Sequence, residues 1–204
     1  MNDLFQPDSW LIRFLTRVCD LIILNVLTLI SCATIVCSGA AITALYSVAL
    51  RMMRKEDGPI VKSFFRSLRS NFIPSVPATI LLFADVLLFA VLHLALYADV
   101  LMFSPNIFIL LSIIAIFFTV LLSYLFPLLA RYDNTFLRQL GNAGRLALAN
   151  LPVSCLLLAV NLLPLLAGMF LPALWAYVVG FMALVGIASG AYINSFYLNR
   201  IFGQ

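Results

Sequence analysis

Asp85 and His93 are two ionisable side chains within one apolar stretch of this 204-residue sequence, and their types could do chemistry. Both fall in residues 78–98, a run long enough to cross a lipid bilayer. A charged side chain near the centre of a membrane helix costs about 2.5 to 3.5 kcal/mol on insertion scales, so such residues are functional candidates. Together, a carboxyl and an imidazole could relay a proton or an ion.

The spacing of these two residues rules out a direct hydrogen bond on one helix. Eight residues place them about 80° apart in azimuth and about 12 Å apart along the axis. A relay would therefore need water or polar groups from other segments, and Asn25 and Asn161 complete our candidate intramembrane polar site. Further polar groups could also contribute: Tyr124, Tyr192 and Asn194. In the alternative that the sequence favours, Asp85 packs against a neighbouring helix or pairs with a snorkelling arginine, and His93 is a hydrogen-bonded residue near the outer interface.

The composition predicts an integral membrane protein built from helices. The sequence is 64% hydrophobic and only 10% charged, with a mean hydropathy of +1.12. Ordinary globular chains are about 45 to 50% apolar and about 25% charged. The apolar runs are long and uninterrupted, unlike the short alternating strands of a membrane barrel. We therefore expect an all-α, polytopic transmembrane bundle that forms a single membrane-embedded domain over residues 1–204.

Five spans are predicted, or six if the first apolar region folds back on itself. Residues 1–17 are expected to form an interfacial lead-in before that region. The predicted regions are 18–53, 78–98, 107–129, 151–171 and 175–198.

Residues 18–53 are longer than one comfortable crossing, because the uncharged part alone would form a helix of about 45 Å against a hydrocarbon core of about 30 Å. The surplus could be absorbed by tilt, or by a break at residues 38–41 that makes a hairpin. The two alternatives place the N-terminus on opposite sides. The hairpin is favoured because it places Arg13 and Arg17 on the same side as the next basic stretch.

Residues 51–74 carry much of the positive charge and are predicted to orient the chain. Within them, residues 60–72 show an apolar side chain every four positions with basic residues opposite, which predicts an amphipathic helix on the inner face. By the positive-inside rule, the basic loops 51–74 and 130–150 and the C-terminus face the cytoplasm. Six residues are candidates for docking anionic lipid or a partner: Arg51, Arg54, Lys55, Lys62, Arg66 and Arg69.

A six-residue pattern occurs twice, as Ser63-Phe-Phe-Arg-Ser-Leu68 and as Thr135-Phe-Leu-Arg-Gln-Leu140. Each copy is followed by an Asn and a Pro near the start of the next apolar span. The pattern suggests a duplicated unit of span, surface helix and span. This duplication is a hypothesis from six matched positions.

Small residues predict close helix packing. Gly186 and Gly190 form a GxxxG pair in the last span, and Gly39 has the same spacing with Thr43. Packing within one chain is favoured over a dimer interface. The oligomeric state is not determined by these patterns.

The sequence contains no signature of an enzyme or of a bound cofactor. It has no phosphate-binding GxxxxGK[ST], no GxSxG and no HExxH, and it contains one histidine. The four cysteines lack metal-ligand spacing. We expect no catalytic residue, no metal, no cofactor and no nucleic-acid partner, and anionic inner-leaflet lipid is the simplest partner for the basic residues.

The chain resembles the YesL-like family of small bacterial membrane proteins, whose function is unknown. The resemblance lies in residues 25–68, with Ser38-Gly-Ala-Ala-Ile-Thr-Ala-Leu-Tyr46 at their centre, and in Phe126-Pro-Leu-Leu-Ala-Arg-Tyr132 with the residues up to Asn150. It implies a bacterial inner-membrane protein and an association with carbohydrate ABC-transport systems. The leading expectation is an accessory or interaction protein of such a system, and the alternative is a small transporter or channel component with Asp85 at a polar cavity.

Overall fold

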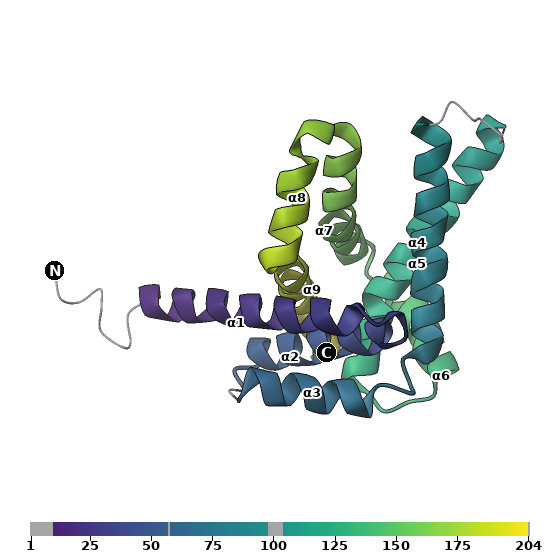
Figure 1. Ribbon diagram of the computed structural model, residues 1–204. Helices are drawn as coiled ribbons and strands as arrows, with labels where there is room; N and C mark the ends of the chain where they lie inside the picture. Colours follow the sequence, from purple (N-terminus) through teal and green to yellow (C-terminus); the bar gives the residue numbers. More distant parts are fainter. Residues whose placement is uncertain (1–9, 57, 98–103, 204) are drawn as a thin grey trace.

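The computed structural model describes residues 10–56, 58–97 and 104–203, and within these ranges the regular structure is entirely helical (Figure 1). The fold class predicted from composition is confirmed. In chain order the helices are α1 (Trp10–Cys32), α2 (Ser38–Met53), α3 (Ile60–Ser70), α4 (Val76–Tyr97), α5 (Pro105–Arg131), α6 (Phe136–Ala149), α7 (Leu151–Phe170), α8 (Trp175–Phe181) and α9 (Ile187–Phe202). Short 3-10 turns at Ile35–Cys37 and Pro172–Leu174 and a π-helical turn at Met182–Gly186 join some of them.

The first apolar region is a hairpin of two helices, so the tilted single span is wrong. The break lies at residues 33–37, a few residues before the predicted one. Residues 38–41 form the first turn of α2 and are buried. The small side chains there serve packing, because a Cβ atom on Gly39 would overlap Oγ1 of Thr79 and lie 2.9 Å from the carbonyl oxygen of Ser75 at the start of α4. The described part of the expected lead-in, residues 10–17, belongs to α1.

The predicted amphipathic helix is α3, and it packs on α1 and α2. Phe64 is fully buried, and Ile60 and Leu68 pack against the same core. The helix starts after Pro59, whose φ of −64° suits a helix start. It ends at Asn71, whose amide nitrogen donates to the carbonyl of Ser67. The bundle itself therefore covers the side of α3 that carries Ile60, Phe64 and Leu68.

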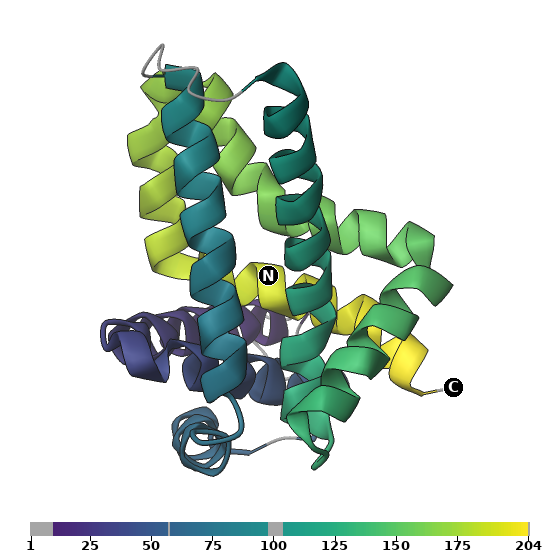
Figure 2. The same cartoon turned by 90° about the vertical axis from the view of Figure 1, so that its right-hand side faces the viewer.

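Two pairs of helices stand upright on a transverse base. In Figure 1 the pair α4 and α5 and the pair α7 and α8 point upward, while α1, α2 and α3 run across below them. Figure 2 shows the same arrangement from the side, with α9 turning away from α8 into the base. The last apolar region thus bends at the π-helical turn and is not one straight helix.

Within the described residues, five helical segments are long and apolar enough to cross a membrane: Leu11–Cys32, Ile35–Met53, Val76–Ala95, Pro105–Arg131 and Trp175–Phe202. The predicted span 151–171 is helical as α7, and its part Leu151–Pro164 is bent by 106° relative to α6. Asn150 separates the two helices. Composition correctly located the apolar regions. The structure divides two of them, the first at residues 33–37 and the last at the π-helical turn.

The core is centred on α2 and on the C-terminal half of α5. Alanines at 40, 41, 44 and 49 of α2 are fully buried, which lets neighbouring backbones approach closely. On α5, every residue from Leu121 to Leu129 is buried. Helix α2 contacts α1, α3, α4, α5 and α9, so it is the central element of the bundle.

Candidate functional site

Asp85 lies in the contact between α4 and α5, with 7% of its surface exposed. One carboxyl oxygen, Oδ2, accepts a hydrogen bond from the Thr119 hydroxyl at 3.0 Å. The other, Oδ1, is buried and has no hydrogen-bond partner among the described residues. The structure therefore pairs Asp85 with a threonine and not with an arginine.

His93 lies further along α4, on an exposed part of the helix. It is two turns beyond Asp85 and outside the buried contact that holds the carboxyl. The two residues singled out by chemistry thus do not share one enclosed site.

Asn161 of α7 belongs to a buried polar network that links four helices. Its amide nitrogen donates to the Ser123 hydroxyl on α5 at 2.8 Å, and its oxygen accepts from Asn194 of α9 at 3.3 Å. Asn194 also donates to the Tyr46 hydroxyl on α2 at 3.2 Å. The Ser123 hydroxyl donates in turn to the carbonyl of Thr119, one turn earlier. Buried polar groups of this kind need partners, and here they fix how the helices meet.

This network reaches the neighbourhood of Asp85 but is not a continuous proton path. The link between Ser123 and Thr119 runs through a main-chain carbonyl, and the links at Asn161 and Asn194 run through amides. Neither group exchanges protons as readily as a hydroxyl, a carboxyl or water. Its clearest role is to join α2, α5, α7 and α9.

Asn25 of α1 has a separate position, at the π-helical turn. Its amide nitrogen donates to the carbonyls of Met182 at 3.0 Å and Ala183 at 2.7 Å, and its oxygen accepts from the amide of Ala188 at 2.9 Å. A π-helical turn interrupts the regular ladder of an α-helix. Fully buried Asn25 supplies the missing partners from another helix. Of the predicted polar residues, Asn161 and Asn194 therefore lie in the network near Asp85, and Asn25 lies elsewhere.

Sequence reasoning missed the hydroxyl groups that complete these contacts. Thr119 and Ser123 stand one turn apart on α5, and Ser154 of α7 makes a buried 3.0 Å hydrogen bond with Tyr124. Serines and threonines one helical turn apart in an apolar span are the signal that could have found them.

The basic docking residues divide between a turn and a helix. Arg54 and Arg51 both approach the carboxylate of Glu56, with N–O distances of 2.9 and 3.5 Å. Lys55 has a φ of 57°, the left-handed conformation that ends α2. These residues form a compact, self-paired turn.

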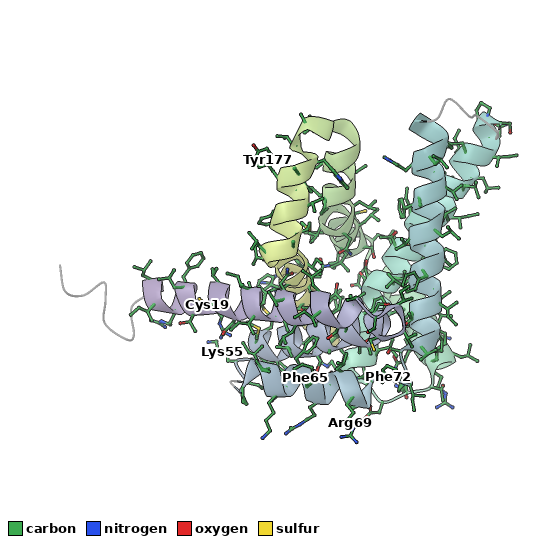
Figure 3. The ribbon with its side chains drawn as sticks, viewed as in Figure 1. Cys19, Lys55, Phe65, Arg69, Phe72 and Tyr177 are labelled. Carbon is green, nitrogen blue, oxygen red and sulfur yellow. The ribbon has the colours of Figure 1, made fainter. Side chains whose placement is uncertain are left out.

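The other three basic residues, Lys62, Arg66 and Arg69, are exposed along α3. Figure 3 shows Arg69 pointing away from the bundle, and Phe65 and Phe72 labelled along the same region of α3 and the turn after it. Phe65 is 50% exposed and Val61 is 47% exposed. The outer surface of α3 thus combines cations with exposed apolar side chains.

The three glycines predicted to mediate packing occupy different contacts. Gly39 meets α4, as described above. A Cβ on Gly186 would lie 2.6 Å from the Met182 side chain within the π-helical turn, and one on Gly190 would be 3.6 Å from Val160 of α7. Gly39 and Gly190 therefore stand at helix contacts within the chain.

A cluster of three or more potential metal ligands is absent from the part of the chain that the structure describes. Its cysteines are free, and Cys19 and Cys155 are exposed.

Comparison with known proteins adds one finding. Residues 21–99, less than half of the chain, match the model of a family described as "Protein of unknown function, DUF624". These residues run from α1 to the end of α4. Neither the curated proteins nor the solved structures yielded a match. The chain is therefore similar, through its hairpin, surface helix and first upright helix, to a family whose function is unknown.

Proposed function

We propose that this protein is an accessory or interaction protein of the bacterial cytoplasmic membrane, held at the inner leaflet by α3, and that it is not an enzyme. The observation that carries the proposal is the outer surface of α3. Lys62, Arg66 and Arg69 are exposed there beside half-exposed Val61 and Phe65. Cations beside apolar side chains suit a surface of anionic headgroups over acyl chains.

The orientation we propose follows from the same helix. Because α3 lies alongside α2 (Figure 1), a transmembrane α2 would draw the three cations of α3 into the hydrocarbon. Each would cost about 2.5 to 3.5 kcal/mol there. We therefore place the upright helices in the bilayer, with the base, the loops 51–74 and 130–150 and the C-terminus on the cytoplasmic side.

The partner we propose is a subunit of a carbohydrate ABC-transport system. Support comes from the resemblance to YesL-like proteins, which often accompany such systems. The fold is consistent with an assisting role, because the described polar groups at depth are mostly bonded to each other.

Photo-crosslinking at Lys62 and Arg69 in native membranes tests the proposal. A crosslinker at either position should capture anionic phospholipid, and a transport subunit should be co-captured. The matched control is Tyr177 of α8, which is 76% exposed at the opposite end of the molecule (Figure 3). Equal capture of anionic lipid at Tyr177 and at α3 would contradict the inner-leaflet anchor. Capture of lipid without any transport subunit would overturn the proposed partner.

A second function, a small transporter or channel component, is favoured by one observation. Asp85 is buried with one oxygen unpaired among the described residues, close to a polar network that crosses the bundle. Purified protein in liposomes separates the two functions. Robust ion or sugar flux that Asp85→Asn abolishes would establish transport, whereas no flux above empty liposomes supports the accessory role.

A further inference from the structure

A cavity of about 660 Å³ opens at the base of the molecule, between the end of α2, α3 and the link from α5 to α6. Four arginines line it, Arg51, Arg66, Arg131 and Arg138, against a single carboxylate, Asp133. Hydroxyl and amide side chains make up much of the remaining wall. A cavity of this size lies within the range of about 300 to 1,000 Å³ that small-molecule sites occupy.

The wall is built from equivalent positions of the two six-residue patterns. The first, fourth and fifth residues of each copy line the cavity: Ser63, Arg66, Ser67, Thr135, Arg138 and Gln139. The second and sixth residues of each copy pack toward the core. The same face of each copy therefore lines the cavity.

A second arginine that lines the cavity stands at the end of the helix before each pattern. Arg51 stands in the last turn of α2, before α3, and Arg131 stands in the last turn of α5, before α6. The first half of the chain thus contributes Arg51 from the end of α2 and Arg66 from α3. The second half contributes Arg131 from the end of α5 and Arg138 from α6. These two pairs form the first and the second arm of the cavity.

Most of the positive charge around the cavity is not neutralised. Among the described residues, Arg66 and Arg138 form no ion pair, and Arg51 approaches Glu56 at 3.5 Å. The Arg131 guanidinium lies over the rings of Tyr132 and Phe202, 5.5 and 5.4 Å from their centres. Its Nη1 is buried and has no hydrogen-bond partner within the same residues. An anionic acceptor would complement these donors.

Gln139 gives the second arm its shape. Its amide nitrogen donates to the carbonyls of Tyr132 at 2.6 Å and Asn134 at 3.3 Å, which holds the link between α5 and α6. In the first arm, Arg51 donates to the Ser63 hydroxyl at 3.3 Å and joins α2 to α3. The arms are thus positioned by their own hydrogen bonds.

We propose that this cavity binds a ligand that carries two phosphate groups, with one arginine arm for each phosphate. The planar guanidinium fork binds phosphate oxygens with two parallel hydrogen bonds, and hydroxyl groups add further donors. Two sources share this chemistry, a soluble diphosphate and a phospholipid headgroup with two phosphates. The site adjoins the outer surface of α3 and shares Arg66 with it, whereas Lys62 and Arg69 do not line the cavity.

Binding measurements on the intact purified protein test the proposal. Titration calorimetry with inorganic diphosphate in detergent probes the soluble source, and nanodiscs of phosphatidylcholine with or without diphosphatidylglycerol probe the lipid source through thermal stabilisation. The proposal expects one of these ligands to bind, and to bind more tightly than its single-phosphate counterpart, inorganic phosphate or phosphatidylglycerol. Saturable binding of neither ligand would overturn it.

Matched variants identify the arms. Arg66→Gln and Arg138→Gln should each weaken binding by about tenfold or more, since each removes charged hydrogen bonds to one phosphate. Arg145→Gln on α6 makes the same charge change on an exposed residue outside both the cavity and α3, and it should change affinity by less than about twofold. Equal losses in all three variants would show non-specific attraction. A loss confined to one of Arg66 and Arg138 would overturn the two-armed site.

If a glutamine variant does not fold, Arg66→Lys and Arg138→Lys replace it. Lysine keeps the charge and loses the fork, so each lysine variant should still bind more weakly than the wild type. Full affinity in both lysine variants would overturn the recognition of phosphate by arginine forks.

Discussion

Asn25 shows how one side chain can stabilise an irregular turn in a distant helix. Its three hydrogen bonds reach residues 182, 183 and 188, more than 150 positions along the chain. The side chain thereby satisfies main-chain groups that a π-helical turn leaves without regular partners. An asparagine in an apolar span was visible in the sequence as a candidate. Its partner was not, because main-chain groups carry no sequence signal.

Replacing Asn25 should loosen the last apolar region. We expect Asn25→Leu to lower the free energy of unfolding by about 1 to 3 kcal/mol, because buried main-chain groups lose their partners. Thermal unfolding in detergent, followed by circular dichroism, measures the change. Val26→Leu is the control, since Val26 is adjacent and 43% exposed. The same loss in both variants would argue against the role of the hydrogen bonds.

At the scale of elements, sequence periodicity was most successful where a helix has two different sides. Ile60, Phe64 and Leu68 predicted the buried side of α3, and the structure buries Phe64 completely. The small residues at 38–41 were ambiguous, because glycine and alanine suit a turn and close packing equally well. Only the position of Thr79 on α4 decides between them. The bend after α6 was hidden for a similar reason, since Asn150 can stand within or between helices.

The contact of α2 with α4 predicts a steric effect. Gly39→Ala should lower the free energy of unfolding by about 1 to 3 kcal/mol, because the new methyl group would overlap Thr79 and crowd a main-chain carbonyl. Denaturant titration of the purified protein measures the loss. Gly180→Ala adds the same atoms where nothing lies within 4 Å, and it should be neutral or slightly stabilising. Equal stability of the two variants would contradict the close approach.

The whole molecule poses a question that composition alone does not answer. In the part of the chain that the structure describes, five segments have the length and hydropathy of membrane spans, yet α1 and α2 run transverse to the upright helices (Figure 1). Membrane helices are usually tilted by about 20° and rarely by more than about 40°. The two sets therefore do not both cross the same flat bilayer. Hydropathy measures how apolar a segment is and carries no information on its direction.

Cysteine labelling distinguishes which set crosses. In a background without the native residues Cys19, Cys32, Cys37 and Cys155, Tyr177→Cys should react with an impermeant reagent from outside the cell and Lys55→Cys only after the membrane is opened. Ile35→Cys lies in the turn between α1 and α2. We expect no labelling of Ile35→Cys from outside, because the hairpin lies at the base. Outside labelling comparable to Tyr177→Cys would show that α1 and α2 cross the bilayer.

The central position of α2 has a consequence for how the protein is made. Among the described elements, its most extensive contacts are with α9, which follows it by about 130 residues. At about 5 to 20 residues per second, α9 leaves the ribosome roughly 7 to 26 seconds after α2. During that interval, Tyr46 of α2 lacks the hydrogen bond that Asn194 of α9 donates to its hydroxyl. Late synthesis therefore completes the bundle, and a nascent chain that stalls before α9 would present α2 to membrane chaperones and proteases.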